Sequence, residues 1–155
     1  MKIKESVIKT LSTFFGVGYL PFMPGTFASL AGLLIYFLIK NNPTVFILVT
    51  ILLTALGFLV SGAAEGLFKK KDPSYVVIDE VAGMLLSLLF IPYDIKWVIA
   101  AFLIFRILDT LKPYPAGQIQ EVKGSTGIML DDIIAAVYTN ILLQVVVRIP
   151  SFRGS

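Results

Sequence analysis

The stretch "VFILVTILLTALGFLVSGAAEGLF", residues 45–68, decides the fold class. Its one charged residue, Glu65, lies close to the C-terminal end of the stretch, which contains no proline. A helix that crosses the hydrocarbon core of a bilayer needs about 20 consecutive, mostly apolar residues. Residues 45–68 therefore predict a membrane-spanning helix.

The composition of the whole chain agrees with this prediction. Of its 155 residues, 57% are hydrophobic and 15% are charged, whereas soluble domains are about 45–50% apolar and about 25% charged. We expect one all-α domain over residues 1–155, a compact polytopic membrane bundle with about four to five hydrophobic helices. Residues 153–155, "RGS", resemble a cloning scar and are assigned no role. Four shorter apolar segments supply the other helices: residues 27–39, 77–91, 95–111 and 133–149.

Basic residues give this bundle an orientation. The first 15 residues, "MKIKESVIKTLSTFF", predict a short amphipathic helix that anchors the N-terminus at the membrane interface. With that end in the cytoplasm and all five segments crossing, nine of the 13 Lys and Arg residues fall on the cytoplasmic side, in line with the positive-inside rule. We expect a multi-pass protein of a bacterial-type cytoplasmic (inner) membrane, with its site facing the cytoplasm. The four basic residues on the other side are Lys40, Lys96, Arg148 and Arg153.

The chain contains no Cys and no His. Their absence excludes a thiolate nucleophile, an imidazole base and an ordinary zinc site. Any chemistry must use carboxylates, hydroxyls, Lys, Arg, Tyr, backbone amides or a hard metal ion.

Two pairs of adjacent acids interrupt apolar runs. Asp79 and Glu80 lie in "VVIDEVAGMLL", residues 76–86, and Asp131 and Asp132 lie in "KGSTGIMLDDIIAA", residues 123–136. Helix capping or the positive helix end accounts for one acid of each pair. Because adjacent side chains on a helix diverge by about a quarter turn, the other acid of each pair is available for binding a metal.

Two further motifs carry possible phosphate ligands. In "FRILDTLKPYP", residues 105–115, Arg106 and Asp109 share a helix face. This pair is either a salt bridge that keeps Arg106 tolerable near lipid, or part of a site in which Arg106 and Lys112 hold a phosphate while Asp109 orients them or binds metal. In "FGVGYLPFMPGTFASLAG", residues 15–32, Thr26 or Ser29 would cap the following helix. Free amides near Gly25 would then attract a phosphate; a purely structural turn accounts for the stretch equally well.

Together these motifs favour one site at the cytoplasmic face. The acidic pairs and Asp109 would repel one another if gathered there, and a hard cation such as Mg²⁺ would resolve that repulsion. With Arg106, Lys112 and amide donors added, the parts suit phosphoryl chemistry.

Four stretches, in this order, resemble the phosphatidylglycerophosphatase A family: "GVGYLPFMPGTFASL", "DPSYVVIDEVAG", "FRILDTLKPYP" and "GSTGIMLDDIIAA". The resemblance covers residues 15–136, with Ala28 and Ala136 where many members are expected to have Gly. It implies a Mg²⁺-dependent membrane phosphatase of phospholipid biosynthesis that converts phosphatidylglycerophosphate to phosphatidylglycerol and inorganic phosphate. The acids carried over by motif as catalytic and metal-binding are Asp79, Glu80, Asp131 and Asp132, with Asp109 as a further catalytic acid.

Other interpretations remain open. The acids could serve a small transporter or an ion-binding membrane protein, although that class usually has inverted halves and a site near the midplane. A purely structural membrane subunit would leave the clustering unexplained, and a soluble bundle would change the fold more than the function. For a phosphatase, the expected partners are the phospholipid substrate and membrane lipids, with neither nucleic acid nor an obligate protein partner. Attack by water and an aspartyl-phosphate intermediate are both compatible with the residues.

Overall fold

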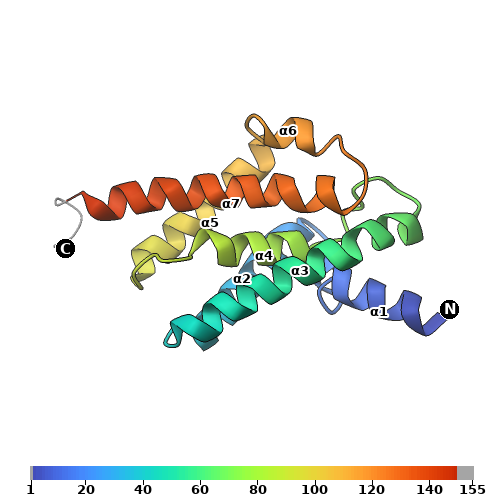
Figure 1. Cartoon of the computed structure of the whole chain (residues 1–155), viewed down its shortest axis with the longest axis horizontal. Coiled ribbons are helices and arrows are strands. Elements are labelled where there is room, and N and C mark those ends of the chain that lie inside the picture. The colour runs from blue at the N-terminus through green and yellow to red at the C-terminus, as the bar shows by residue number, and fades with distance from the viewer. Residues whose placement is uncertain (1, 150–155) are drawn as a thin grey trace.

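The computed structural model describes residues 2–149, and this part of the chain is helical without any strand (Figure 1). The predicted all-α class is therefore confirmed. Residues 153–155, which include Arg153, lie outside the described part of the chain. The elements, in chain order, are α1 (Lys2–Ser12), the short 3-10 helix η1 (Val17–Tyr19), α2 (Pro24–Ile39), α3 (Pro43–Phe68), α4 (Ile78–Ser87), α5 (Ile95–Leu111), α6 (Ala116–Ile119) and α7 (Ser125–Arg148).

Local signals explain where the longer helices begin and end. The Asn42 side chain accepts a hydrogen bond from the Val45 N–H at 3.1 Å and so caps α3. Asp94 caps α5 in the same way through the Lys96 N–H, at 2.8 Å. α5 ends where Lys112 turns left-handed, with φ 46°, directly before Pro113, which cannot continue a helix.

The central helix, α4, is shorter than the apolar segment 77–91 in which it lies. It ends at Ser87, and the following residues turn back toward α5. Asn140 on α7 supplies the reason: its side-chain amide donates to the carbonyls of Ser87, at 3.1 Å, and Leu89, at 2.7 Å. These bonds satisfy carbonyl groups that the end of a helix leaves free.

α4 is enclosed by other helices. It packs against α7, α2, α3 and α5, and eight of its ten residues are buried. Gly83 allows close approach to α5, because a Cβ there would lie 2.6 Å from the Phe105 ring. The start of α4 is therefore held rigidly inside the bundle.

The surface of the bundle is unusually apolar. Among the described residues, α3 and α7 are the two helices long and apolar enough to cross a membrane. Only 28% of an apolar 18-residue stretch of α3 and 33% of one of α7 are buried within the fold, whereas the core helix of a soluble domain is mostly buried. Large exposed side chains on these two helices include Leu48, Ile51, Leu59, Ile141 and Val145.

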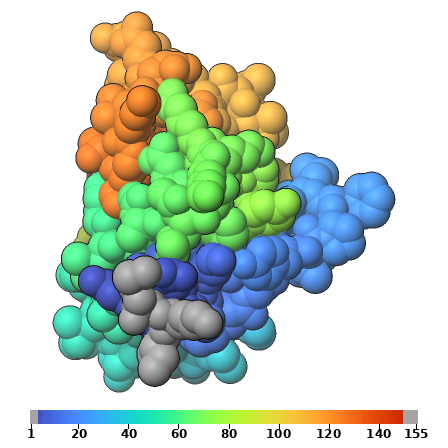
Figure 2. All heavy atoms as spheres, turned by 90° about the vertical axis from the view of Figure 1, so that its right-hand side faces the viewer, coloured from blue at the N-terminus to red at the C-terminus, as the bar shows by residue number. Residues whose placement is uncertain are grey.

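α3 and α7 run along the long axis in opposite directions, so the connections gather at two ends (Figure 1). The segments after α3 and before α7, together with α1, lie at one end, which Figure 2 views directly. The α2–α3 and α4–α5 connections lie at the other end. The acidic motifs belong to the first end.

Candidate active site

Three carboxylates meet between α4 and α7. Asp79 and Glu80 lie in the first turn of α4, and Asp132 lies in the second turn of α7. Each offers an oxygen atom, and these atoms lie within 4.8 Å of one another. The close packing of α4 on α7 brings them together, and a hydrogen bond of 2.9 Å from the Val77 N–H to the Ser12 carbonyl helps to fix the start of α4.

These carboxylates are buried and incompletely paired. Asp79 is 6% exposed and Asp132 is 2% exposed. Within residues 2–149, the buried atoms Asp79 Oδ1, Glu80 Oε2 and Asp132 Oδ2 have no hydrogen-bond partner. Because unpaired buried carboxylates are strongly unfavourable, the cluster is suited to holding a metal ion. Clustered carboxylate oxygens are the ligands that Mg²⁺ prefers, so these residues fit that ion.

The helix starts differ from the capping predicted for the acids. Val77 is the N-cap residue of α4, so Asp79 does not cap it. α7 begins at Ser125, which places Asp131 and Asp132 beyond the first turn. Capping by Asp79 is therefore wrong, and so is the positive helix end as the explanation for Asp131 and Asp132, whereas Asp79 and Glu80 do lie in the first turn of α4.

Asp131 and Asp132 point to different partners. Asp131 Oδ2 accepts a hydrogen bond from Lys112 Nζ, and its Oδ1 accepts one from the Asp132 N–H at 3.0 Å. Asp131 is consequently held by a cation, while Asp132 belongs to the group of three carboxylates.

Asp109 bridges two cations at the end of α5. Its Oδ2 lies 2.8 Å from Arg106 Nη1, and its Oδ1 lies 3.5 Å from Lys112 Nζ. Burial lowers the pKa of the Lys112 ammonium, but the hydrogen bond and charge of Asp131, with neighbouring carboxylates, more than offset this, so its pKa lies above the ordinary value. Lys112 thus stays protonated, and it joins Asp109 to Asp131.

The start of α2 lies against this charged group. A Cβ on Gly25 would overlap Glu80 Oε1 and lie 3.2 Å from Arg106 Nη2, so only glycine fits without a shift. Ser29 Oγ donates to the Gly25 carbonyl at 2.9 Å and accepts from Arg106 at 3.5 Å. The predicted capping by Thr26 or Ser29 is wrong, because α2 begins at Pro24 with Met23 as its N-cap residue.

A polar pocket of about 250 Å³ opens over the acids. Gly25, Thr26, Ser29 and Arg106 lie outside its lining. The lining includes Asp72, Ser74, Thr110 and Gln120, to which the sequence motifs assigned no role. The side chain of Gln120 donates to Asp72 Oδ2 at 2.7 Å. The polar and charged lining residues are Asp72, Ser74, Asp79, Glu80, Asp109, Thr110, Lys112, Gln120, Asp131 and Asp132.

Comparisons with known proteins relate the chain to lipid phosphatases. A family model described as "Phosphatidylglycerophosphatase A" matches residues 10–147. A protein of Bacteroides thetaiotaomicron named "Putative phosphatidylinositol-3-phosphatase" is 37% identical over 144 residues, which cover 87% of this chain and 90% of that protein. Phosphatidylglycerophosphatase A of Escherichia coli is 38% identical over 130 residues (82% of this chain, 76% of the relative).

A third relative extends the agreement. Phosphatidylglycerophosphatase A of Haemophilus influenzae is 33% identical over 140 residues (88% of this chain, 86% of the relative). No solved structure matches the chain. The family match spans all four motifs, so the resemblance drawn from them is confirmed. The chain is a phosphatase that belongs to the phosphatidylglycerophosphatase A family.

Proposed function

We propose that this protein hydrolyses phosphatidylglycerophosphate to phosphatidylglycerol and inorganic phosphate in phospholipid biosynthesis, with Mg²⁺ as its cofactor. The observation that carries the proposal is the group of three buried carboxylates with unpaired oxygens. It lies beside a chain of alternating charges, Arg106–Asp109–Lys112–Asp131. Membership of the family supports the reaction class.

The metal ligands in this proposal are Asp79, Glu80 and Asp132, with Asp131 adjacent as a fourth acid. Bound there, Mg²⁺ would supply positive charge that stabilises the phosphoryl oxygens in the transition state. The unpaired oxygens of the three acids point to an ion held directly by carboxylates.

In this proposal Lys112 binds the phosphate of the substrate, and Arg106 supports it. Lys112 lines the pocket, and Asp109 holds its ammonium group in place. Arg106 lies behind this pair and is oriented by Asp109 and Ser29. A phosphate entering the pocket would replace part of the carboxylate contact of Lys112, with Arg106 adding positive charge nearby.

Asp131 acts as the base in this proposal. It lines the pocket, and Lys112 and the Asp132 N–H fix its orientation. In the proposed step the oxygen of a water molecule attacks phosphorus and its proton passes to Asp131. The phosphorus–oxygen ester bond breaks, and the released glycerol oxygen takes a proton from water at the pocket mouth. The hydroxide left by that water is neutralised by the proton that Asp131 returns to solvent. An aspartyl-phosphate intermediate is the alternative, and trapping a covalent phosphoenzyme would establish it.

The same proposal places the chain in a bacterial inner membrane as a multi-pass protein with four to five hydrophobic helices. The exposed apolar side chains of α3 and α7 support it. So does the acidic pocket, because its lining includes Asp72 from the segment after α3, which also carries Lys69 and Lys70 beside Lys123. We propose that this end of the bundle faces the cytoplasm and that α1 lies at its interface.

The test is phosphate release from phosphatidylglycerophosphate in detergent micelles, with Mg²⁺ or with EDTA. We expect release to require Mg²⁺ and to be lost in Asp79→Asn and Asp131→Asn. Glu121→Gln is the matched control, because Glu121 is an exposed acid that pairs with Lys71 and lies outside the lining of the acidic pocket. Release that survives both aspartate substitutions would remove those acids from the mechanism.

Assaying a second substrate determines which lipid headgroup the protein prefers. Because one relative is named for a phosphatidylinositol phosphate, phosphatidylinositol 3-phosphate should be assayed in parallel. Faster hydrolysis of the inositol lipid would replace the proposed substrate while leaving the phosphatase site intact. Failure to hydrolyse either lipid would count against the reaction class and favour the transporter interpretation.

A further inference from the structure

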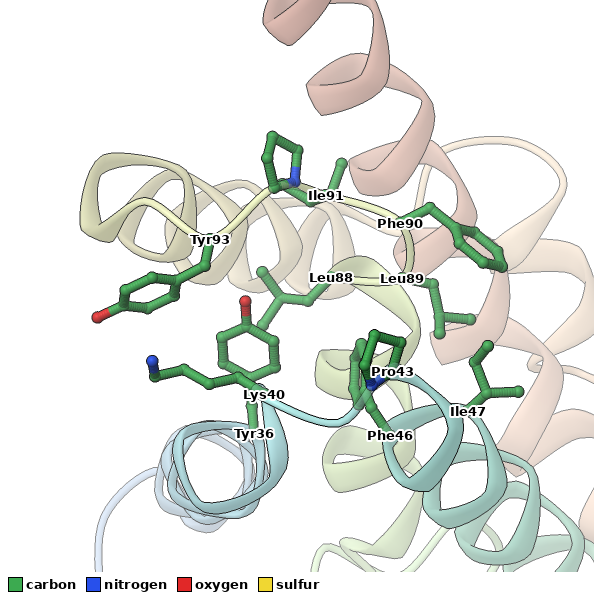
Figure 3. Close-up of a pocket in the computed structure, with 11 residues that line it drawn as sticks. Tyr36, Lys40, Pro43, Phe46, Ile47, Leu88, Leu89, Phe90, Ile91 and Tyr93 are labelled. Carbon is green, nitrogen blue, oxygen red and sulfur yellow. The ribbon is translucent and has the colours of Figure 1, made fainter.

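A second pocket lies at the opposite end of α4 from the acids. It has a volume of about 360 Å³ and is formed by the end of α2, the start of α3 and the segment that follows α4 (Figure 3). Lys40, Tyr36 and Tyr93 gather on one side of it, and Phe90, Leu89 and Ile47 on the other. The proposed hydrolysis makes no use of this pocket.

The polar side of this pocket carries one positive charge. Lys40 is the charged residue of the lining, and its Nζ lies 3.7 Å from the centroid of the Tyr93 ring. A ring face attracts an ammonium group but does not neutralise it. The neighbouring Asn41 side chain, which accepts from Lys40 at 3.3 Å, is also uncharged. This side therefore suits an anion.

The apolar side of the pocket adjoins a groove along α3. The groove has a volume of about 380 Å³ and shares Ile47, Leu89 and Phe90 with the first pocket. It is apolar despite two threonines, because the Thr50 hydroxyl donates to the Phe46 carbonyl and the Thr54 hydroxyl to the Thr50 carbonyl, each at 2.8 Å. Both threonines thus satisfy their hydroxyls within the helix.

We propose that the adjoining pocket and groove together bind one phospholipid with an anionic headgroup. Its phosphate lies at Lys40, and one acyl chain lies in the groove beside Ile47 and Phe58. The site has the same arrangement as a phospholipid. A cation and two phenols at the end of the bundle correspond to the headgroup, and the apolar groove beside them corresponds to an acyl chain. The lining contains no carboxylate, so the amine of a zwitterionic headgroup finds no counter-charge.

Native mass spectrometry of the full-length protein in mild detergent and EDTA tests this site. The probes are phosphatidylglycerol and phosphatidylethanolamine with identical acyl chains. We expect one tightly retained phosphatidylglycerol per chain. Lys40→Gln should weaken its binding about fivefold, the effect of removing one cation near an anionic lipid. Lys96→Gln removes a charge at the same end but outside the lining, and should leave binding unchanged.

A second pair of variants tests the groove. Ile47→Trp fills the junction between pocket and groove and should abolish the retained lipid. Leu48→Trp adds the same volume to an exposed neighbour outside both linings and should keep it. Phosphatidylglycerol is also the product of the proposed reaction and could be retained in the acidic pocket. Lys112→Gln alters that pocket, so lipid that this variant still retains is assigned to the second site.

The outcomes separate clearly. Equal retention of the two lipids, or equal loss in the members of either matched pair, would overturn the proposal. Loss of the lipid in Lys112→Gln alone would assign it to the acidic pocket instead. None of these readouts depends on phosphatase activity, so the second site stands or falls independently of the proposed reaction.

Discussion

Lys112 and Asp131 form a hydrogen-bonded ion pair that joins the residue after α5 to the second turn of α7. The same ammonium group lies 3.5 Å from Asp109. Lys112 thus contacts both the proposed base, Asp131, and Asp109, the carboxylate that pairs with Arg106. The pair links two motifs that are separate in the sequence.

Lys112→Gln should lower kcat about 10²–10³-fold, the usual effect of losing one donor that stabilises transition-state charge. Lys112→Arg keeps the charge and should recover part of the activity. Steady-state kinetics on micellar substrate, with the fold checked by circular dichroism, provides the measurement. Equal activity in Lys112→Gln and wild type would remove Lys112 from phosphate binding.

Relative to wild type, Asp132→Asn should raise the melting temperature without metal and lower it when Mg²⁺ is present. In EDTA the substitution removes one of several buried, mutually repelling carboxylates, so the melting temperature should rise. Wild type should be stabilised by added Mg²⁺, because a ligand that binds only the folded state raises stability, whereas the variant should lose most of that increase. Thermal melts of both proteins at several Mg²⁺ concentrations test this. A Mg²⁺-induced increase of the same size in the variant would count against Asp132 as a ligand.

Gly25→Ala should reduce activity with little effect on folding. Its Cβ would displace the Glu80 carboxylate, which belongs to the proposed metal site, so the Mg²⁺ concentration for half-maximal activity should rise. Gly66→Ala is the matched control, because a Cβ at that helical position meets nothing within 4 Å. It should leave activity unchanged and stabilise the fold by about 0.5–1 kcal/mol. An identical Mg²⁺ dependence in Gly25→Ala and wild type would contradict the argument.

Gln120→Ala should raise KM more than it lowers kcat. The hydrogen bond from Gln120 to Asp72 joins the segment after α3 to the end of α6 at the pocket mouth, so its loss should loosen headgroup binding without altering the acids. Glu121→Gln disrupts the neighbouring ion pair between Lys71, whose side chain is 42% exposed, and Glu121, whose side chain is 79% exposed. Such exposed pairs contribute about 0–1 kcal/mol to stability. It should leave both kinetic constants unchanged. A selective fall in kcat for Gln120→Ala would assign Gln120 to the chemistry.

Much of the helical layout could be predicted from local sequence. Residues 95–111 were predicted as a segment and form α5 with the same bounds, because Asp94 and Pro113 mark its ends locally. The end of α4 could not be predicted in this way. It depends on Asn140, which lies more than 50 residues later and binds the carbonyls at Ser87 and Leu89.

The site shows the same division between local and distant information. The acidic pairs were visible as charges in apolar runs, but the different partners of Asp131 and Asp132 depend on the position of Lys112 in space. Gln120 lies in a loop with no distinguishing pattern and enters the pocket only through the packing of α6 on α7. The predicted caps at Thr26 and Ser29 were wrong because α2 begins earlier, at Pro24.

The carboxylate cluster of Asp79, Glu80 and Asp132 has a consequence for the environments in which the protein can work. Its donors are all oxygen atoms, and the chain has no sulfur ligand from Cys and no imidazole. Thiol oxidants and alkylating reagents therefore have no cysteine to attack. Soft metals such as Cu(I), which favour thiolate and thioether ligands, should compete poorly for a site of hard oxygen donors. The site should stay functional under oxidative stress that inactivates thiol-dependent phosphatases.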